Sequence, residues 1–364
     1  MSSPQPPTPP KTGGSRLLPV GFVLLLVVAA GGYYLYERSK NKPEPPPDEF
    51  QALKPFFTQL GKSQTLAEGY ADTNKDLVAD APTDPAKFLK VEEIGFTTVG
   101  TDDEERLKRE QAEWADFMKA LEAATGKKVK YLTDVPSPEG QMEALRAGRL
   151  HVTAFNTGAV PAAVNTAGFV PLFAPADAQG NFTIQMQILV KADSPIQKPE
   201  DLRGKTVGFV SLSSNSGAKA PMVILKDKYG MLPGRDYQYK LSGDHFVSLA
   251  GVVYGTDYDA VCVASDLKDR AVAAGKIKFG PQEKDLKAEQ FRVILSSDPF
   301  PPLCFGVPHN LPPEVRAGVE KAFRDYKFTG ASARRAKFVP VNYEKDWKYV
   351  REIDAALGRF AEIP

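Results

Sequence analysis

The chain has 364 residues, of which 42% are hydrophobic and 25% are charged, so it is long enough to bury more than one hydrophobic core. Its 46 basic residues are balanced by 45 acidic ones and are spread along the sequence, which gives a net charge of +1. This composition argues against a disordered chain and against a nucleic-acid-binding protein, because a phosphate backbone requires clustered cations. Any anion that the protein binds should therefore be small.

The N-terminal segment is predicted to enter a membrane. Residues 1–16 form a proline-rich tail, and residues 17–36 are an uncharged stretch of 20 residues, about the length that a helix needs to cross ~30 Å of hydrocarbon. Tyr33 and Tyr34 at the end of the apolar run suit a membrane interface, so we favour an uncleaved transmembrane anchor. A cleaved signal peptide is the alternative. Basic residues flank both ends, so the positive-inside rule does not settle the orientation.

Residues 37–90 are predicted to be a linker between the anchor and the main domain. The proline-rich stretch 43–47 favours an extended, stiff spacer. Further on, side chains that carry oxygen recur at the spacing of a calcium-binding loop; these are Asp72, Asn74, Asp76 and Asp80. Leu77 stands where an EF-hand loop has glycine, so a hydrated acidic turn is the alternative to a calcium site.

From residue 91 the pattern becomes regular α/β. A strand in "EEIGFTTVG" is followed by a helix that begins at a capping box of Thr101 and Glu104 and ends at Gly126. Strands at "KVKYL" and "HVTAF" then alternate with helices at "GQMEALRAG" and "GAVPAAVNTAG". This β-α-β-α-β run predicts a mainly parallel sheet.

A second run of the same kind follows the bridging segment "FTIQMQILV". Strands at "KTVGFVS", "YQYKL" and "YDAVCVAS" alternate with helices at 217–230 and "DHFVSLAGVVYG", and strands at "FRVILSS" and "LCFGV" lead back toward the first lobe. We therefore expect one solute-binding domain over residues 91–364, with a cleft for a small ligand between two lobes. Lobe 1 should comprise residues 91–181 and 293–364, and lobe 2 residues 182–292.

Four small polar residues stand in a row where a predicted strand meets a predicted helix: Ser213, Ser214, Asn215 and Ser216. One capping residue would suffice there, so an ordinary turn with a single N-cap serine is the simpler alternative. Ligands gather at the carboxyl ends of strands in open α/β sheets, where helix N-termini present unpaired N–H groups and partial positive charge. A tetrahedral oxyanion needs several donors, which these side chains and nearby N–H groups supply, and Gly217 lets the backbone approach closely.

These segments resemble a known family. "VSLSSNSGAKAP" is similar to the Ser-Thr-Ser-Gly segment of the periplasmic phosphate-, phosphite- and phosphonate-binding proteins of ABC transporters. Further motifs resemble that family in the same order, namely "MEALRAGRLHVTAFNTGAV", "LSGDHFVSLAGVVYGTDYDAVCVASD" and "SSDPFPPLCFGVPHNLPPEV". The resemblance covers about residues 91–330. It implies a two-lobed α/β fold of the type II periplasmic-binding-protein kind, with hinge strands that cross between the lobes.

The resemblance also implies which residues contact the ligand. The serines around Asn215 should bind the phosphorus oxygens, with Asn215 standing where the family commonly has threonine. His245, in "SGDH", matches the family's histidine near the same oxygens, and a purely structural histidine is the alternative. The first lobe should contribute polar residues that follow its strands: Asn156, Thr157, Thr97 and Thr98.

The sequence predicts a binding protein and not an enzyme. It has no nucleophile elbow, no P-loop and no pair of metal-binding histidines, although some enzymes share the two-lobed architecture. Cys262 and Cys304 lie in apolar runs and are expected to be buried free thiols. We expect a membrane-anchored monomer, facing the periplasm or the cell exterior, that captures a phosphorus oxyanion and docks on an ABC permease. An anchored sensor with a separate signalling chain is the alternative function.

The return segment bears on the class of ligand. Family members that take aminoalkyl phosphonates carry acidic residues in the hinge region of the second lobe and in the return segment. This chain has Asp266 near the first place, whereas Pro302, Leu303 and Cys304 occupy the second and Asp298 lies upstream. Burying an ammonium group against apolar residues without a carboxylate is costly. We therefore expect phosphate, phosphite or a small alkyl phosphonate to bind better than 2-aminoethylphosphonate.

Overall fold

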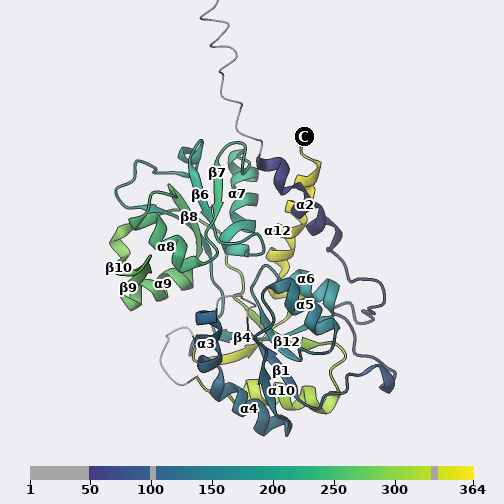
Figure 1. The fold of residues 1–364 in the computed structure, drawn as a ribbon. Helices are drawn as coiled ribbons and strands as arrows, with labels where there is room; N and C mark the ends of the chain where they lie inside the picture. The colour runs from purple at the N-terminus through teal and green to yellow at the C-terminus, as the bar shows by residue number, and fades with distance from the viewer. Residues whose placement is uncertain (1–48, 99–103, 329–334) are drawn as a thin grey trace, which may run out of the picture. The chain divides into compact units, whose positions relative to one another are not determined.

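The computed structural model describes residues 49–98, 104–328 and 335–364, which form two β-sheets flanked by helices (Figure 1). The expected tail, the expected anchor and residues 37–48 of the expected linker lie outside this part of the chain, as does Thr101 of the expected capping box. None of the helices in the described residues combines the length and the apolar character that a membrane span requires.

The first sheet has the strand order β13-β4-β12-β3-β1-β2. Its strands are β1 (Ile94–Thr97), β2 (Val129–Tyr131), β3 (Val152–Phe155), β4 (Phe169–Ala176), β12 (Cys304–Pro308) and β13 (Lys337–Pro340). β1 is parallel to β2 and β3, whereas β12 is antiparallel to both β3 and β4, and β13 is antiparallel to β4. The predicted β-α-β-α-β run is therefore parallel, but the sheet as a whole is mixed, because the strands β12 and β13 from the returning part of the chain enter it in the opposite direction.

Five helices belong to the first lobe: α3 (Glu104–Glu113), α4 (Ala115–Thr125), α5 (Pro138–Arg146), α6 (Val160–Ala167) and α10 (Pro313–Asp325). The single helix expected up to Gly126 is two helices, α3 and α4, which meet at Trp114. Trp114 is buried, and its ring packs against Phe96, Phe117 and Phe305. Packing of this large side chain into the core accompanies the break in the helix.

The second sheet has the strand order β11-β5-β8-β6-β7. Its strands are β5 (Met186–Lys191), β6 (Thr206–Phe209), β7 (Gln238–Leu241), β8 (Ala260–Ala264) and β11 (Phe291–Ser296), and its helices are α7 (Ala220–Tyr229), α8 (His245–Tyr254) and α9 (Ser265–Ala274). β6 lies between β8 and β7 and is parallel to both, whereas β5 is antiparallel to β8 and β11. A hairpin of β9 (Lys276–Phe279) and β10 (Gln282–Asp285) lies outside both large sheets.

Two chain segments join the sheets. One runs from β4 to β5 and the other from β11 to β12, and they pair through Ile184 and Phe300, whose backbones exchange two hydrogen bonds of 2.8 Å. Because β11 still pairs with β5, the chain returns to the first sheet after residue 296 and not at residue 293. These paired crossings are the hinge strands of a two-lobed fold.

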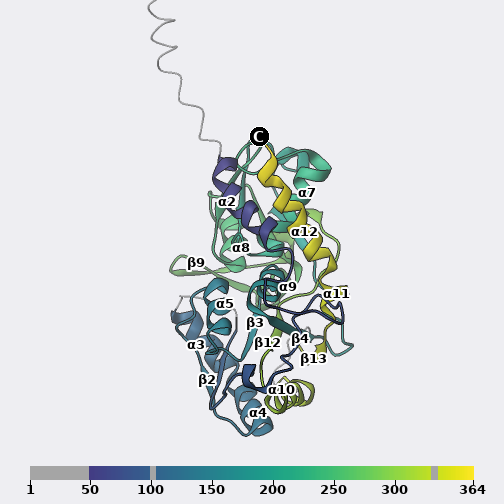
Figure 2. The same ribbon diagram turned by 90° about the vertical axis from the view of Figure 1, so that its right-hand side faces the viewer.

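The expected linker contains a helix of the folded unit. α2 (Glu49–Lys62) buries Phe50, Leu53, Phe57 and Leu60, which recur at helical spacing and face the protein core. It packs against the C-terminal helix α12 (Lys348–Gly358), as both views show (Figure 1, Figure 2). α12 also contacts α7, so the last part of the chain reaches the second lobe although it was expected to belong to lobe 1.

Short elements complete the described fold: α11 (Tyr343–Asp346), a π-helical turn (Asn215–Lys219), and 3-10 turns at Pro85–Lys87, Pro199–Leu202, Ala288–Gln290 and Arg359–Glu362. Both cysteines are buried and free, which confirms the prediction from sequence. Burial raises the pKa of both thiols, so neither is a reactive thiolate at neutral pH.

Candidate ligand-binding site

The segment Ser213–Gly217, here called the polar corner, joins β6 to α7 through the π-helical turn. Ser214 caps this turn: its Oγ accepts the Gly217 N–H at 3.0 Å. A side chain at position 217 would bring its Cβ within 2.6 Å of the Val210 Cβ, so glycine is required there. The corner thus places the N-terminus of a helix at the carboxyl end of β6, which is parallel to both of its neighbours.

The segment Asn156–Gly158, here called the opposing loop, follows β3 of the first sheet and reaches the polar corner. A Cβ at Gly158 would lie only 2.3 Å from the Ser213 carbonyl oxygen and 2.7 Å from the Asn215 nitrogen. Asn156 folds the loop by accepting the Ala159 N–H at 3.0 Å. The structure therefore brings together two predicted sets of site residues that lie about 60 positions apart in the sequence. Gly158, which the sequence analysis did not single out, permits their close approach.

Asn215 is the least satisfied side chain of the corner. It is 1% exposed, and neither its Nδ2 nor its Oδ1 has a hydrogen-bond partner among the described residues. The Ser216 side chain is buried as well, and no hydrogen bond is assigned to its hydroxyl within the described part of the chain. Leaving a buried amide unpaired costs about 1–3 kcal/mol, which is a cost that a bound polar group can remove.

His245 lies at the same edge of the second sheet. It begins α8 directly after Asp244, whose carboxylate accepts the Phe246 N–H at 2.6 Å and caps the helix. The His245 Nδ1 accepts the Ala264 N–H, at the end of β8, at 3.3 Å. In the neutral imidazole the proton is therefore on Nε2, which makes that atom a donor. The chain just before His245 is joined to the segment between β6 and the polar corner by a 2.9 Å bond from the Gly243 N–H to the Val210 carbonyl.

Thr97 and Thr98 are buried where β1 ends in the first lobe. The Thr98 hydroxyl bonds the Glu110 carboxylate and lies 3.2 Å from the Tyr131 hydroxyl, and its carbonyl accepts from the Gln141 Nε2 at 2.6 Å. The polar groups of Thr98 are thus used inside the first lobe. The opposing loop, in contrast, touches the polar corner directly.

The acidic loop is closed by its own hydrogen bonds. The Asp72 carboxylate accepts the N–H groups of Asp76 at 3.0 Å and Leu77 at 3.1 Å, and the Asp80 carboxylate accepts the Thr73 N–H at 2.7 Å. Leu77 has a left-handed φ of 68°, the conformation that glycine would adopt most easily. Across the described residues, no group of three or more His, Cys, Asp or Glu is arranged to hold a metal ion. Calcium binding by Asp72, Asn74, Asp76 and Asp80 stays a prediction.

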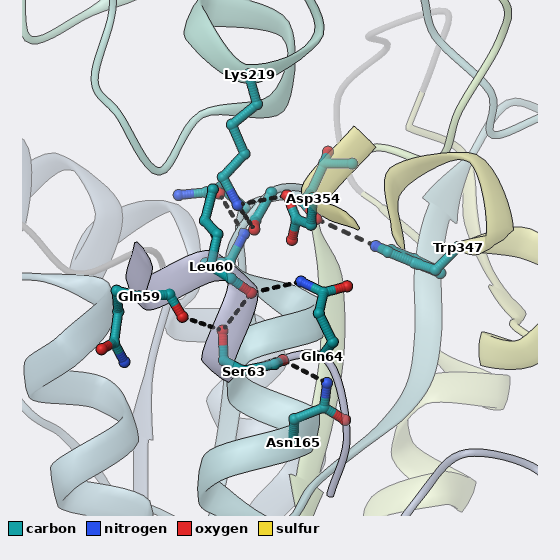
Figure 3. Close-up of polar contacts among 12 residues, drawn as sticks. Gln59, Leu60, Ser63, Gln64, Asn165, Lys219, Trp347 and Asp354 are labelled. Atoms are coloured by element: carbon teal, nitrogen blue, oxygen red, sulfur yellow. Dashed lines mark hydrogen bonds and ion pairs between the residues drawn. The ribbon is translucent and has the colours of Figure 1, made fainter. Parts of the chain in front are cut away.

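A buried ion pair joins the two parts of the site (Figure 3). Lys219, the last residue of the π-helical turn, donates from its Nζ to the Gly158 carbonyl at 2.7 Å and to the Asp354 carboxylate at 2.9 Å. Both side chains are almost fully buried, at 3% and 2% exposure. Trp347 holds the same loop by donating from its Nε1 to the Thr157 carbonyl at 3.2 Å. Lys219 precedes the apolar run of α7, and its local sequence did not indicate a partner as distant as Asp354.

The fold and the site define a solute-binding protein of the two-lobed periplasmic-binding-protein kind, with paired crossing strands and a polar helix N-terminus facing a loop of the other lobe. The model of one protein family, described as the periplasmic substrate-binding protein of phosphonate ABC transporters, matches residues 103–347, which is more than half of the chain. The chain belongs to this family. It is therefore a substrate-binding component of a transporter and not an enzyme, as the sequence predicted.

Solved structures share the fold at low sequence identity. A binding protein component of an ABC phosphonate transporter from Pseudomonas aeruginosa is 20% identical, with 73% of this chain and 87% of that chain covered and a TM-score of 0.59. A Xanthomonas citri protein bound to ATP is 18% identical, with 74% and 98% covered and a TM-score of 0.58. PhnD1 from Prochlorococcus marinus, in complex with methylphosphonate, is 15% identical, with 72% and 97% covered and a TM-score of 0.55.

Proposed function

We propose that this substrate-binding protein captures phosphate, phosphite or a small alkyl phosphonate and delivers it to its ABC permease. The observation that carries the proposal is the contact between the polar corner and Gly158 of the opposing loop. It puts hydroxyl, amide and N–H donors of one lobe directly against the other lobe, where a small tetrahedral anion would contact both.

Donors from the second lobe make most of the proposed contacts. The free N–H groups of the helix start, the hydroxyls of Ser213, Ser214 and Ser216, the Asn215 amide and the His245 imidazole would surround the phosphorus oxygens. Gly217, which has no side chain, would let the ligand approach the backbone closely. The first lobe would add the polar residues Asn156 and Thr157. Thr97 and Thr98 would also contribute, with the Thr98 hydroxyl exchanging its bond to Glu110 for a bond to the ligand.

Hinge closure would couple binding to transport. A ligand that contacts only one lobe in the open protein and both lobes in the closed protein favours closure by the difference between the two binding free energies. The closed form would then be the form that the permease recognises. The proposed mechanism needs no charged protein side chain in contact with the ligand, because the helix N-terminus and neutral donors stabilise the anion.

We also propose that residues 17–36 tether the protein to the membrane as a monomer. The apolar length of this segment and its terminal tyrosines support the tether. The remaining linker is short, because α2 begins at Glu49 and belongs to the folded unit.

Calorimetry tests the proposed ligand class directly. Full-length protein in detergent micelles would be titrated with phosphate, phosphite, methylphosphonate, 2-aminoethylphosphonate and sulfate. We expect saturable 1:1 binding of at least one of the first three. Binding of none of them, by protein shown to be folded, would refute the proposed ligand class.

A further inference from the structure

Lys219 is the one side chain of the π-helical turn that leaves the polar corner and bonds to other parts of the described chain. Its backbone N–H and that of Ala218 both bond the Ser214 carbonyl, at 3.0 and 3.1 Å, which is how the turn accommodates an additional residue. Each residue of a helix turns the chain by about 100°, so this addition reorients the side chain at position 219 relative to an ordinary helix start. The reoriented side chain points to Asp354 (Figure 3), and it also donates to the Gly158 carbonyl.

The ion pair ties three segments that are distant in the sequence. Lys219 ends the π-helical turn that begins within the polar corner, Gly158 ends the opposing loop of the first lobe, and Asp354 lies in α12. The opposing loop has two further attachments, from Trp347 to the Thr157 carbonyl and from the Thr157 hydroxyl to the Pro301 carbonyl at 2.9 Å. Lys219 provides the charged attachment that joins this loop to the turn carrying the polar corner.

Stability alone is a poor explanation of this pair. Two charges buried at this depth lose their hydration, and replacing a buried ion pair by apolar side chains of similar size is often neutral or even stabilising. Burial raises the pKa of the Asp354 carboxyl, which reflects that cost, and the neighbouring Lys219 opposes the rise. An ion pair also imposes a geometry that apolar contacts do not, because the ammonium group must meet its acceptors at hydrogen-bonding distance.

We infer that Lys219 and Asp354 are positioning residues. Their ion pair holds the polar corner and the opposing loop at the relative position that ligand binding requires. The inference rests on the proposed function, because it concerns the same site. Neither side chain needs to touch the ligand. Removing the pair should therefore weaken ligand binding even where the fold and its stability are preserved.

The test is a variant that removes both charges together, Lys219→Met/Asp354→Leu, in the full-length protein. Phosphate, phosphite and methylphosphonate are each titrated by calorimetry, and the melting temperature is recorded without ligand. We expect a melting temperature near that of the parent and an affinity for the tightest ligand that is at least tenfold weaker. A pair that serves only stability predicts parental affinity whatever the melting temperature, and this result would overturn the inference.

Two further variants keep the test decisive. Asp354→Asn retains an oxygen that can accept from Lys219, and it replaces the double variant if that variant does not fold. We expect its ligand affinity to fall at least threefold. Parental affinity would again count against the inference. The control is Arg203→Met/Asp236→Asn, which removes an ion pair of the second lobe that has no contact with the opposing loop. It should bind like the parent.

Tryptophan emission gives a positional readout. Trp347 touches the opposing loop, so we expect ligand to change its emission in the parent and to change it at most half as much in Lys219→Met/Asp354→Leu at saturation. An equal change in both would contradict the inference. If the parent itself binds none of the three ligands, the proposed function fails and the inference falls with it. If the parent binds and the variants bind equally well, only the inference fails.

Discussion

At the scale of single residues, Ser216 offers the cleanest test of the polar corner. Its hydroxyl carries no assigned hydrogen bond in the described part of the chain, so Ser216→Ala should leave the unfolding free energy almost unchanged. A hydroxyl that donates to a desolvated anion contributes about 1.5–3 kcal/mol, so ligand affinity should fall roughly 10- to 150-fold. Calorimetry measures the affinity, and denaturant titration measures the stability. Unchanged affinity would remove Ser216 from the site.

Ser214 should behave differently from Ser216. Its Oγ caps the π-helical turn, so Ser214→Ala is expected to lower the unfolding free energy by about 1 kcal/mol in addition to weakening the ligand. Ser137 is a matched control, because it caps α5 in the first lobe by accepting the Gly140 N–H at 3.2 Å. Ser137→Ala should lose similar stability and bind ligand normally. Equal affinity losses in both variants would point to a general effect of lost caps.

His151 should make the fold sensitive to acid. The Gly95 N–H donates to its Nδ1 at 2.9 Å, its Nε2 has no partner among the described residues, and burial lowers its pKa to about 4. The folded pKa lies below the ordinary value of about 6.5, so the unfolded chain binds the proton first as the pH falls. Stability contributed by the neutral ring is therefore present above pH 6.5 and is lost toward pH 4.

The expected loss is about 2 kcal/mol of unfolding free energy between pH 7 and pH 5, from denaturant titrations at each pH. His151→Asn keeps an oxygen near the Nδ1 position that can accept the Gly95 N–H, and it cannot be protonated in this range. Its stability should vary much less over the same interval. A parental pH dependence in this variant would assign the acid sensitivity to other groups, such as His309, whose pKa burial also lowers.

At the scale of secondary-structure elements, α2 is predicted to be part of the cooperative fold. Phe57 is fully buried and its ring lies 5.4 Å from that of Phe360, so Phe57→Ala should reduce the unfolding free energy by about 3–5 kcal/mol. Gln59 is exposed on the same helix, and Gln59→Ala should change stability by less than about 0.5 kcal/mol. Equal stabilities of the two variants would support the original view of this segment as a linker.

The elements that sequence analysis predicted well are those with strong local signals. The regular alternation of apolar strands and helices predicted the two sheets and the crossings, and the row of small polar residues predicted the corner. α2 was missed because its four buried residues sit between a proline-rich spacer and an acidic turn, and because Pro55 lies inside the helix. Local composition there outweighed the helical spacing of the apolar residues.

The contacts that join the lobes had no comparable local signal. Gly158 must be glycine because the backbone of the other lobe lies against it. Lys219 is paired with a carboxylate that lies 135 positions later in the chain. The π-helical turn that aims Lys219 is a feature of the backbone that side-chain periodicity does not report. Such requirements become visible only when segments distant in the sequence lie next to one another.

At the scale of the whole molecule, the binding site is predicted to prefer phosphonates without an amino group. Asp266 lies close enough to Arg335 for its charge to act on the guanidinium, and Asp298 is exposed and acts on Tyr349 of α12. Each carboxylate thus has a neighbouring protein group on which its charge acts. We expect methylphosphonate to bind at least tenfold more tightly than 2-aminoethylphosphonate in competition calorimetry. A preference for the aminated ligand that Asp266→Asn or Asp298→Asn abolishes would show that one of these carboxylates lies in the cleft.

The tether is also predicted at this scale. Full-length protein should stay in the membrane fraction after a carbonate wash, because a span of about 20 apolar residues is held by the bilayer and not by surface charge. A chain that begins at Asp48 should be released and should still bind ligand, and it serves as the control. Sequencing the mature N-terminus separates the alternatives: a start beyond residue 30 would identify a cleaved signal peptide.

Both ends of the folded unit are fastened at one point of the second lobe. The Arg235 guanidinium lies 4.9 Å from the centre of the Phe50 ring at the start of α2, and it donates to the carbonyl of Pro364 at 2.6 Å. Mechanical load arriving through residues that precede Glu49 therefore enters the lobe that carries the polar corner, and it is not applied across the hinge. We consequently expect force on the proposed tether to leave the opening and closing of the cleft unchanged, so that the protein binds ligand with the same affinity with and without that force.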